Sequence, residues 1–450
     1  MNSDKKLAGD EIVRAVIEES KQRNVEHAEA YFDSERELSI EVRDGQVENL
    51  KVAKDAGLGI RVIQNGRLGY AYTTELTWGN LANTLEIALA NAKAASEDSY
   101  YTLPEPATSY PELDLDDPQL GQVSLEEKIE MARQMERSGR SFDPLVQLTE
   151  HVSYEEVSYE IAIANSKGVS LTSGGDLCGG MAAFVAGKDG DQQTGFSVDY
   201  VRRLKDLDPD DLGKEAARKA VRMIGAQRLS TKRVPVVMDP YVVSSFLGML
   251  ASALSAEAVQ KGRSLFAGKI GERVVSELVT IVDDGAKPGG IASAPFDGEG
   301  VPTQKTVLVD SGILQGFMYN SYTAAKDGVS STGNGARGSF QSPPSLGSSN
   351  FYVAPGKGSQ EAIINETGEG FYLTEVMGMH TANPISGDFS LGAAGIWIHN
   401  GELITPVRGM VIAGNILELL AGVDAVGSDL RFFAGRGAPT VRVANLTVSG

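Results

Sequence analysis

The stretch Gly59-Ile-Arg-Val-Ile-Gln-Asn-Gly-Arg-Leu-Gly-Tyr-Ala-Tyr72 contains the strongest local fold signal in the chain. Two strand-like segments flank Asn65-Gly66, and an Asn-Gly pair in this position predicts a tight β-hairpin, because both residues tolerate positive φ. A second hairpin is predicted just before it, where Leu38–Val42 alternates, Asp44-Gly45 forms a turn and residues 46–54 return. Antiparallel sheet is therefore expected in this region.

Helices are predicted on both sides of these strands. Residues 11–21 form an amphipathic pattern with Ile12, Val13, Val16 and Ile17 on one face, and residues 80–95 form an alanine-rich helix. The order helix, antiparallel strands, helix is typical of an α+β fold. We therefore expect N-terminal α+β subdomains with antiparallel sheets and a strand-rich C-terminal domain.

The length of 450 residues predicts two or three domains. We place an N-terminal α+β subdomain at 1–100, a linker and second α+β subdomain at 101–230, and a C-terminal domain at 231–450. Between Lys93 and Lys128 four prolines interrupt an acidic stretch without basic residues, which indicates a linker or an extended surface crossing. The second unit then starts with Ser124 as a helix N-cap, continues through a hairpin around 165–168, and ends in a helix over 210–227.

The third unit is rich in glycine and strand patterns, with hairpins predicted at 310–312 and 400–401. One long buried helix is predicted from Tyr241 to about Gln260, where small residues at Ser244, Gly248, Ser252 and Ser255 make a stripe that admits a close neighbour or opens onto a cavity. A structural role is the favoured interpretation of that stripe. Residues 327–350 are nearly all Gly, Ser, Asn, Thr and Pro, so we expect them to be too polar to pack and to form a long mobile loop over a groove.

Composition excludes several function classes. The net charge of −19 repels phosphate backbones, so no nucleic-acid partner is expected. No apolar run reaches the ~18–20 residues that span a bilayer, and residues 1–10 contain no signal-peptide pattern. We therefore expect a cytoplasmic protein without membrane contact. Cys178 is the single cysteine, which rules out an intramolecular disulfide and a multi-cysteine zinc site.

The usual catalytic motifs are also missing. Residues 333–338 match the spacing of a dinucleotide fingerprint, but no strand precedes them, and Pro343-Pro344 follows where a helix should begin. The four histidines (27, 151, 380 and 399) are too far apart for one helix to present two of them to zinc. The best candidates for peptide binding are Arg337 and a polar cluster of His380, Asn383 and Asp388. The alternative for this cluster is a turn whose side chains bind their own backbone.

Six motifs together resemble the TldD/PmbA family, formerly described as modulators of DNA gyrase. They are residues 71–75 (Ala-Tyr-Thr-Thr-Glu), 331–334 (Ser-Thr-Gly-Asn), 387–390 (Gly-Asp-Phe-Ser), 400–407, 412–415 and 446–450. The resemblance covers nearly the whole chain. It implies an α+β N-terminal part, a strand-rich C-terminal part, and a dimer around an enclosed cavity that admits unfolded peptide.

The resemblance also separates two branches. The TldD branch carries His-Glu-x-x-x-His on the buried helix and a cysteine near the C-terminus. Alignment on residues 261–264 places Leu247, Gly248 and Ser252 at these positions, and residues 432–438 contain no cysteine. Leucine and glycine cannot ligate zinc, and serine is a poor ligand. The chain therefore resembles the TldE (PmbA) branch, the metal-less partner of TldD, with no cofactor and no catalytic residue of its own. Installing the motif by substitution at these three positions is expected to damage the fold, because Leu247 would pack in the core and a Glu at 248 would clash or be buried unpaired.

Three functions remain open. The leading hypothesis is a non-catalytic subunit that completes the substrate chamber of a metallopeptidase with a TldD-type partner; in the family the pair processes a microcin leader peptide and degrades an unfolded antitoxin. A homodimeric peptide-binding protein without a catalytic partner is the second. The third is a hydrolase with an unrecognised site, such as His380 with Asp388.

Overall fold

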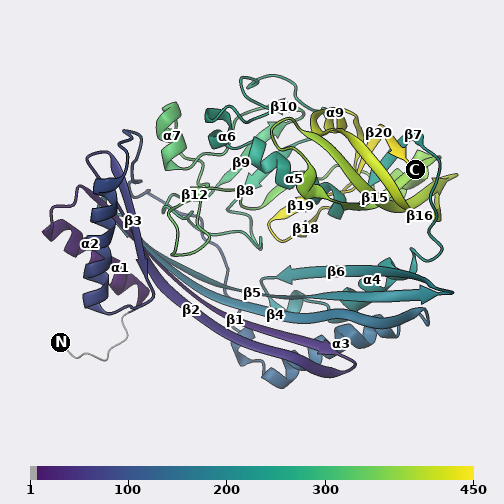
Figure 1. Cartoon of the computed structure of the whole chain (residues 1–450), viewed down its shortest axis with the longest axis horizontal. Helices are drawn as coiled ribbons and strands as arrows, with labels where there is room; N and C mark the ends of the chain where they lie inside the picture. The colour runs from purple at the N-terminus through teal and green to yellow at the C-terminus, as the bar shows by residue number, and fades with distance from the viewer. Residues whose placement is uncertain (1–7) are drawn as a thin grey trace.

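The chain folds into two layers that face each other, in a computed structural model that describes residues 8–450 (Figure 1). A long curved antiparallel sheet with helices makes one layer, and the C-terminal half makes the other. Helices and antiparallel or mixed sheets occur in both layers, so the predicted α+β class is confirmed. Within residues 8–450 no helix is both long and apolar enough to cross a membrane.

The first layer is built on a single six-stranded sheet with the order β3-β2-β1-β4-β5-β6. Its strands are β1 (His27–Arg43), β2 (Gln46–Gln64), β3 (Arg67–Thr73), β4 (Val146–Asn165), β5 (Ser170–Lys188) and β6 (Asp191–Val201). Both predicted N-terminal hairpins are confirmed, at β1–β2 and β2–β3. The antiparallel pairing of β1 with β4 runs the sheet across the boundary at residue 100.

Helices cover the two ends of this sheet. Near one end lie α1 (Gly9–Gln22) and α2 (Trp78–Ala94), and near the other lie α3 (Leu125–Arg140) and α4 (Pro209–Val221). Ser124 caps α3 as predicted, accepting from the backbone N–H of Glu127 while the Glu127 carboxylate accepts from the backbone N–H of Ser124. The stretch between α2 and α3 has no long element, only η1 (Leu120–Gln122), and crosses the surface with Leu103 and Leu115 buried. A further short turn, η2 (Leu204–Asp206), precedes α4.

The second layer contains two six-stranded sheets with the orders β10-β9-β8-β13-β19-β18 and β16-β15-β14-β7-β20-β17. The strands are β7 (Lys232–Met238), β8 (Ile281–Asp284), β9 (Lys305–Asp310), β10 (Ile313–Leu314), β13 (Phe351–Val353), β14 (Gly370–Met377), β15 (Asp388–His399), β16 (Glu402–Asn415), β17 (Val423–Val426), β18 (Arg431–Phe433), β19 (Arg436–Ala438) and β20 (Val441–Ser449). A separate pair is formed by β11 (Gly335–Ala336) and β12 (Ser345–Leu346). The helices are α5 (Pro240–Ala253), α6 (Ala256–Gln260), α7 (Ser321–Asp327), α8 (Gln360–Thr367), α9 (Ile416–Ala421) and the short turn η3 (Met379–Thr381). The predicted hairpins at 310–312 and 400–401 are confirmed.

The prediction of one helix over residues 241–260 is wrong. α5 ends at Ala253, and Ser255 caps a second helix, α6, by accepting from the backbone N–H of Ala258. Between them the backbone pairs with Met318, which donates to the carbonyl of Leu254 and accepts from the N–H of Ala256. The interruption therefore depends on a segment more than sixty residues away, which local helix propensity does not show.

The prediction of a mobile polar loop over residues 327–350 is also wrong. Phe340 and Asn350 are almost fully buried, and Asn334 is 3% exposed. The polar groups are buried because they find partners: Asn334 Nδ2 donates to Asp283 at 2.7 Å, and the Tyr70 hydroxyl donates to the carbonyl of Phe340 at 2.6 Å. The second of these bonds joins the two layers, so the segment packs between them.

Candidate functional site

Helix α5 is buried on most of its surface but has one open face. Its apolar residues belong to the core cluster of the second layer, in contact with both sheets. Four of its accessible residues, Tyr241, Ser245, Gly248 and Ser252, are spaced by four, three and four positions, and Ala251 beside them is also partly accessible. This spacing places them on one side of the helix. Of the predicted small-residue stripe, Gly248 and Ser252 lie on this side, whereas Ser244 and Ser255 are buried.

The open face lies between the two layers. The Tyr241 ring packs edge-on against Phe196 of β6, with centroids 5.3 Å apart, and against Phe433 of β18, with centroids 5.2 Å apart. Phe196 belongs to the long sheet and Phe433 to the second layer. The three rings therefore form an aromatic bridge between the layers at the N-terminal end of α5.

A positive charge stands against the middle of this face. A Cβ placed on Gly248 would lie 3.0 Å from Nη1 and 3.1 Å from Cζ of Arg436, the first residue of β19. Arg436 is exposed, and its guanidinium forms no ion pair with any carboxylate in the part of the chain that the structure describes. The face thus presents a free cation beside a helix backbone that has no side chain at this point.

Two cavities of about 400 Å³ each extend between the layers. The β6 cavity is lined by Tyr200 of β6, by Arg202 just after that strand, and by Lys287 and Phe432 from the second layer, among others. The α4 cavity is lined by residues of α4 from the first layer and by residues of α5, α8 and β18 from the second. Both cavities are therefore completed only when the layers face each other.

The three positions aligned with a zinc motif do not fit a metal ion. Leu247 is 1% exposed and packs in the core, Gly248 has no side-chain donor, and Ser252 offers an exposed hydroxyl. The nearby C-terminal segment contributes the cation Arg436. Among residues 8–450 no three His, Cys, Asp or Glu side chains lie close enough together to hold a metal. Zinc requires N, S or O donors and is disfavoured by an adjacent positive charge.

The predicted polar cluster forms a hydrogen-bonded turn before β15. Asn383 Oδ1 accepts from the backbone N–H groups of Ile385 and Ser386 at 2.9 and 3.2 Å. The Asp388 carboxylate accepts from Asn415 Nδ2 and from the Ser386 hydroxyl, and these two bonds lower the pKa of Asp388. His380 is exposed on η3, and within residues 8–450 it forms no hydrogen bond with Asp388. The bonds of Asn383 are those of the turn interpretation, whereas the Asp388 carboxylate binds other side chains.

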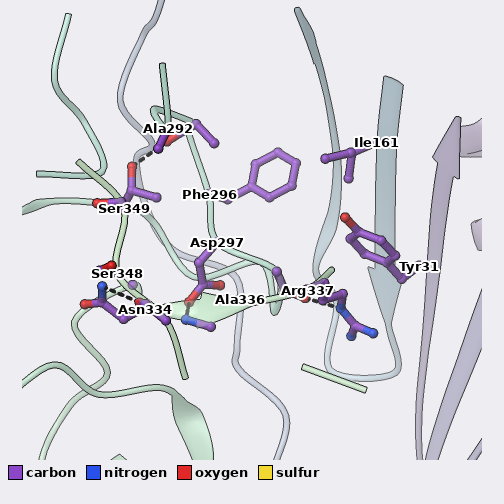
Figure 2. A pocket seen from close by; sticks show the side chains of 16 residues that line it. Tyr31, Ile161, Ala292, Phe296, Asp297, Asn334, Ala336, Arg337, Ser348 and Ser349 are labelled. Carbon is purple, nitrogen blue, oxygen red and sulfur yellow. Dashed lines mark hydrogen bonds between the residues drawn. The ribbon is translucent and has the colours of Figure 1, made fainter. Parts of the chain in front are cut away.

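Arg337 lies elsewhere, in the segment between the layers. It forms an ion pair with Glu29 of β1 in which both side chains are 1% exposed, and its guanidinium stacks on the Tyr31 ring, 4.5 Å from the centroid. Nε donates to the carbonyl of Gly298 at 2.6 Å. Arg337 and Tyr31 also line a cavity of about 210 Å³, in which Figure 2 shows Asp297 near Asn334 with Phe296 forming one wall.

Arg337 is part of a buried charge network that sequence reasoning missed. Arg61 of β2 contacts Glu29 at 2.6 Å and Glu299 at 3.1 Å, and each of these side chains is at most 6% exposed. Asp297 accepts from the N–H of Gly335 at 2.7 Å; burial, and secondarily the charge of Glu299, raise the pKa of Asp297 to about 7. Arg61 and Glu299 are 238 residues apart, and Arg337 and Glu29 are 308 residues apart, so no local sequence pattern reveals these pairs. The available signal is a single charge in an apolar strand, as in Ile60-Arg61-Val62.

Comparison with known proteins shows the class of protein to which this architecture belongs. Three domain models of PmbA/TldA metallopeptidases match the chain: domain 1 at residues 28–92, the central domain at 118–224 and the C-terminal domain at 231–450. The chain therefore has the three-part body of this class of metallopeptidase. It belongs to the PmbA/TldD family, and the predicted resemblance is confirmed.

Individual relatives extend over nearly the whole chain. The metalloprotease PmbA of Escherichia coli O157:H7 is 29% identical, covering 92% of this chain and 90% of its own. The crystal structure of a putative modulator of a DNA gyrase from Thermotoga maritima is 32% identical with a TM-score of 0.90, covering 97% and 99%. TldE from Thermococcus kodakarensis is 26% identical with a TM-score of 0.89, covering 98% and 99%.

Proposed function

We propose that this protein is the non-catalytic, TldE/PmbA-like subunit of a TldD/TldE-type metallopeptidase that acts on unfolded peptides or on peptide leaders in the cytoplasm. The observation that carries the proposal is the set of residues at the positions expected to match the zinc motif: Gly248 and Ser252 lie on the open face of α5, Leu247 is buried in the core, and Arg436 lies against Gly248. The chain has the fold of the metallopeptidase family, but the residues at these positions do not fit zinc. This combination is expected for a non-catalytic partner subunit.

The open face of α5 and the aromatic bridge beside it, together called the interlayer surface, have the properties of a peptide-binding surface. Aromatic rings at Tyr241, Phe196 and Phe433 offer apolar contact, and Arg436 offers a charged donor for carbonyl or carboxylate oxygens. Such a surface holds an extended chain without a nucleophile or a metal. In this proposal the TldD-type subunit supplies the metal chemistry, and this chain contributes binding surface to the shared chamber.

The test measures peptide cleavage by this protein alone and by an equimolar mixture of this protein and a TldD-type protein from the same genome. Casein and a flexible fluorogenic peptide are the substrates, each with and without a zinc chelator. We expect no cleavage by the isolated chain and chelator-sensitive cleavage by the mixture. Co-purification from the native cell under a tag on this chain is expected to recover the TldD-type protein.

Two outcomes would favour the other hypotheses. Chelator-insensitive cleavage by the isolated chain, lost in the His380→Ala variant, would show that it is a hydrolase with its own site. A stable homodimer that binds peptide, together with a mixture that cleaves no better than the TldD-type protein alone, would indicate a binding protein without a catalytic partner.

A further inference from the structure

The α4 cavity is lined by charged side chains from both layers, three arginines and four carboxylates. Arg218 and Arg222 come from the end of α4, and Arg431 comes from β18 on the opposite layer. Lys219 lies close by: burial lowers its pKa against the opposing charges of Glu215 and Asp239. Three arginines from two layers thus line one cavity of about 400 Å³, and Lys219 lies beside them.

Two of these cations, Arg222 and Arg431, have no carboxylate within ion-pair distance among residues 8–450. Arg218 forms an ion pair with Glu215, and Lys219 contacts the same carboxylate at 3.6 Å. In addition, Arg222 Nε is buried and has no hydrogen-bond partner. A buried guanidinium donor without an acceptor is unfavourable, so this atom indicates that an acceptor comes from outside the chain.

The carboxylates that face the same cavity have other partners or other positions. Asp239 accepts from the backbone N–H of Tyr241 at 3.0 Å and from the Tyr372 hydroxyl at 2.6 Å. Asp429 accepts from the backbone N–H and the hydroxyl of Thr440 at 3.1 and 2.7 Å. The remaining acids of the lining are Glu215, which is already paired, and Glu361 in the first turn of α8. None of these groups forms an ion pair with Arg222 or Arg431. Two further carboxylates interact with them without an ion pair: burial raises the pKa of Glu375 against the charge of Arg222, and burial raises the pKa of Asp199 against the charge of Arg431.

The position of the cavity connects it with the open face of α5. Asp239 and Pro240 line the cavity and begin α5, and the next residue, Tyr241, is the first residue of the open face. A peptide that lies along this face therefore reaches the cavity at the N-terminal end of α5. Guanidinium groups bind carboxylates with paired, charge-assisted hydrogen bonds, which makes a carboxylate the matching ligand for Arg222 and Arg431.

We propose that the α4 cavity is a subsite that binds a carboxylate group of the peptide ligand, either its C-terminal carboxylate or an acidic side chain. The proposal rests on the proposed function, since it deepens the peptide-binding role of the interlayer surface. Arg222 and Arg431 hold the two oxygens, and the aromatic bridge at Tyr241 contacts the adjacent residues of the peptide.

The experiment uses three flexible peptides of the same sequence, each with an N-terminal dansyl group and measured by fluorescence anisotropy on the full chain. The first ends in a free carboxylate and has no acidic side chain, the second is amidated, and the third is amidated with one internal Glu. We expect at least one carboxylate-bearing peptide to bind about tenfold more tightly than the neutral peptide, with the difference reduced by added salt. Which of the two binds better identifies the source of the carboxylate.

Variants assign this preference to the cavity. Arg222→Gln and Arg431→Gln are each expected to weaken binding of the preferred peptide about five- to tenfold, while binding of the neutral peptide is unchanged. Arg228→Gln is the matched control, because Arg228 is exposed and does not line the cavity. Arg431 is also exposed, so its variant tests the site even if Arg222→Gln unfolds, as judged by thermal melting.

Equal binding of all three peptides, or a carboxylate preference that survives both arginine variants, would overturn the subsite. Its failure is distinguishable from failure of the proposed function. A chain that stimulates the TldD-type partner but shows no carboxylate preference refutes only the subsite. A chain that shows the preference but never supports cleavage refutes only the partnership.

Discussion

Arg436 of β19 lies directly against Gly248 of α5, so that a side chain at position 248 would meet its guanidinium group first. Sequence reasoning alone predicts that a Glu at this position clashes or is buried without a partner. The structure corrects this expectation, because position 248 is partly accessible and faces a free cation. The consequences of substitution at 247 and at 248 are therefore opposite.

Gly248→Ala is expected to stabilise the protein by about 0.5–1 kcal/mol, because glycine within a helix is less favourable than alanine by that amount. The new Cβ meets only the end of an exposed, flexible arginine side chain. The free energy of unfolding of Gly248→Glu is expected to lie within about 1 kcal/mol of the parent value, since the carboxylate can pair with Arg436. Urea unfolding measures both values; a loss above about 2 kcal/mol in either variant would show that the site is closed.

Leu247→His is expected to destabilise the fold by about 2–5 kcal/mol. Leu247 is 1% exposed within the largest core cluster, so the change removes apolar burial and adds a polar ring. Leu247→Met, which conserves volume, is the control and should lose less than about 1.5 kcal/mol. The triple variant with Gly248→Glu and Ser252→His is expected to inherit the loss and to show no shift of its melting curve on addition of zinc. A triple variant as stable as the parent that binds zinc would contradict this expectation.

The purified protein is expected to contain no stoichiometric zinc. The reason is the donor set at positions 247, 248 and 252 together with the cation at Arg436, neither of which suits a divalent metal. Elemental analysis after dialysis measures the content, with a TldD-type protein purified in parallel as the positive control. About one tightly bound zinc per chain would refute the proposed division of roles.

Arg337→Met is expected to lower the free energy of unfolding by about 3–5 kcal/mol, because it leaves the buried Glu29 carboxylate with only Arg61 as a counter-ion. The double variant Glu29→Gln/Arg337→Met should lose clearly less than the sum of the two single variants. Unfolding of all four proteins completes a double-mutant cycle for this contact between the layers. Additive losses would indicate that the pair contributes no coupling.

Asp297 makes stability depend on pH in a predictable direction. Burial raises its pKa in the folded protein to about 7, above the value near 4 of an unfolded chain. Between these values the folded state binds more protons, so this group's contribution is fully present below about pH 4 and is lost as pH rises to about 7. The free energy of unfolding of Asp297→Asn, minus that of the parent, should therefore increase from pH 4.5 to pH 7.5. A difference independent of pH would contradict the assignment.

The sequence by itself determined the elements whose signals lie within a few residues. Asn65-Gly66 and Asn400-Gly401 specify hairpins because both residues of each pair adopt positive φ, and Ser124 with Glu127 specifies the start of α3 through reciprocal hydrogen bonds. The burial of α5, including Leu247, followed from its nearly continuous apolar pattern. The poor fit of its motif positions to zinc followed from residue chemistry alone.

Only the tertiary structure decided which distant residues meet. The end of α5 depends on Met318, the packing of residues 327–350 depends on acceptors and donors in both layers, and Arg337 finds Glu29 across 308 positions. Polar segments pack when such partners are available, and a single sequence does not state which partners will be near. The same holds for the α4 cavity, because Arg222 and Arg431 come from different layers and face each other only after the layers close.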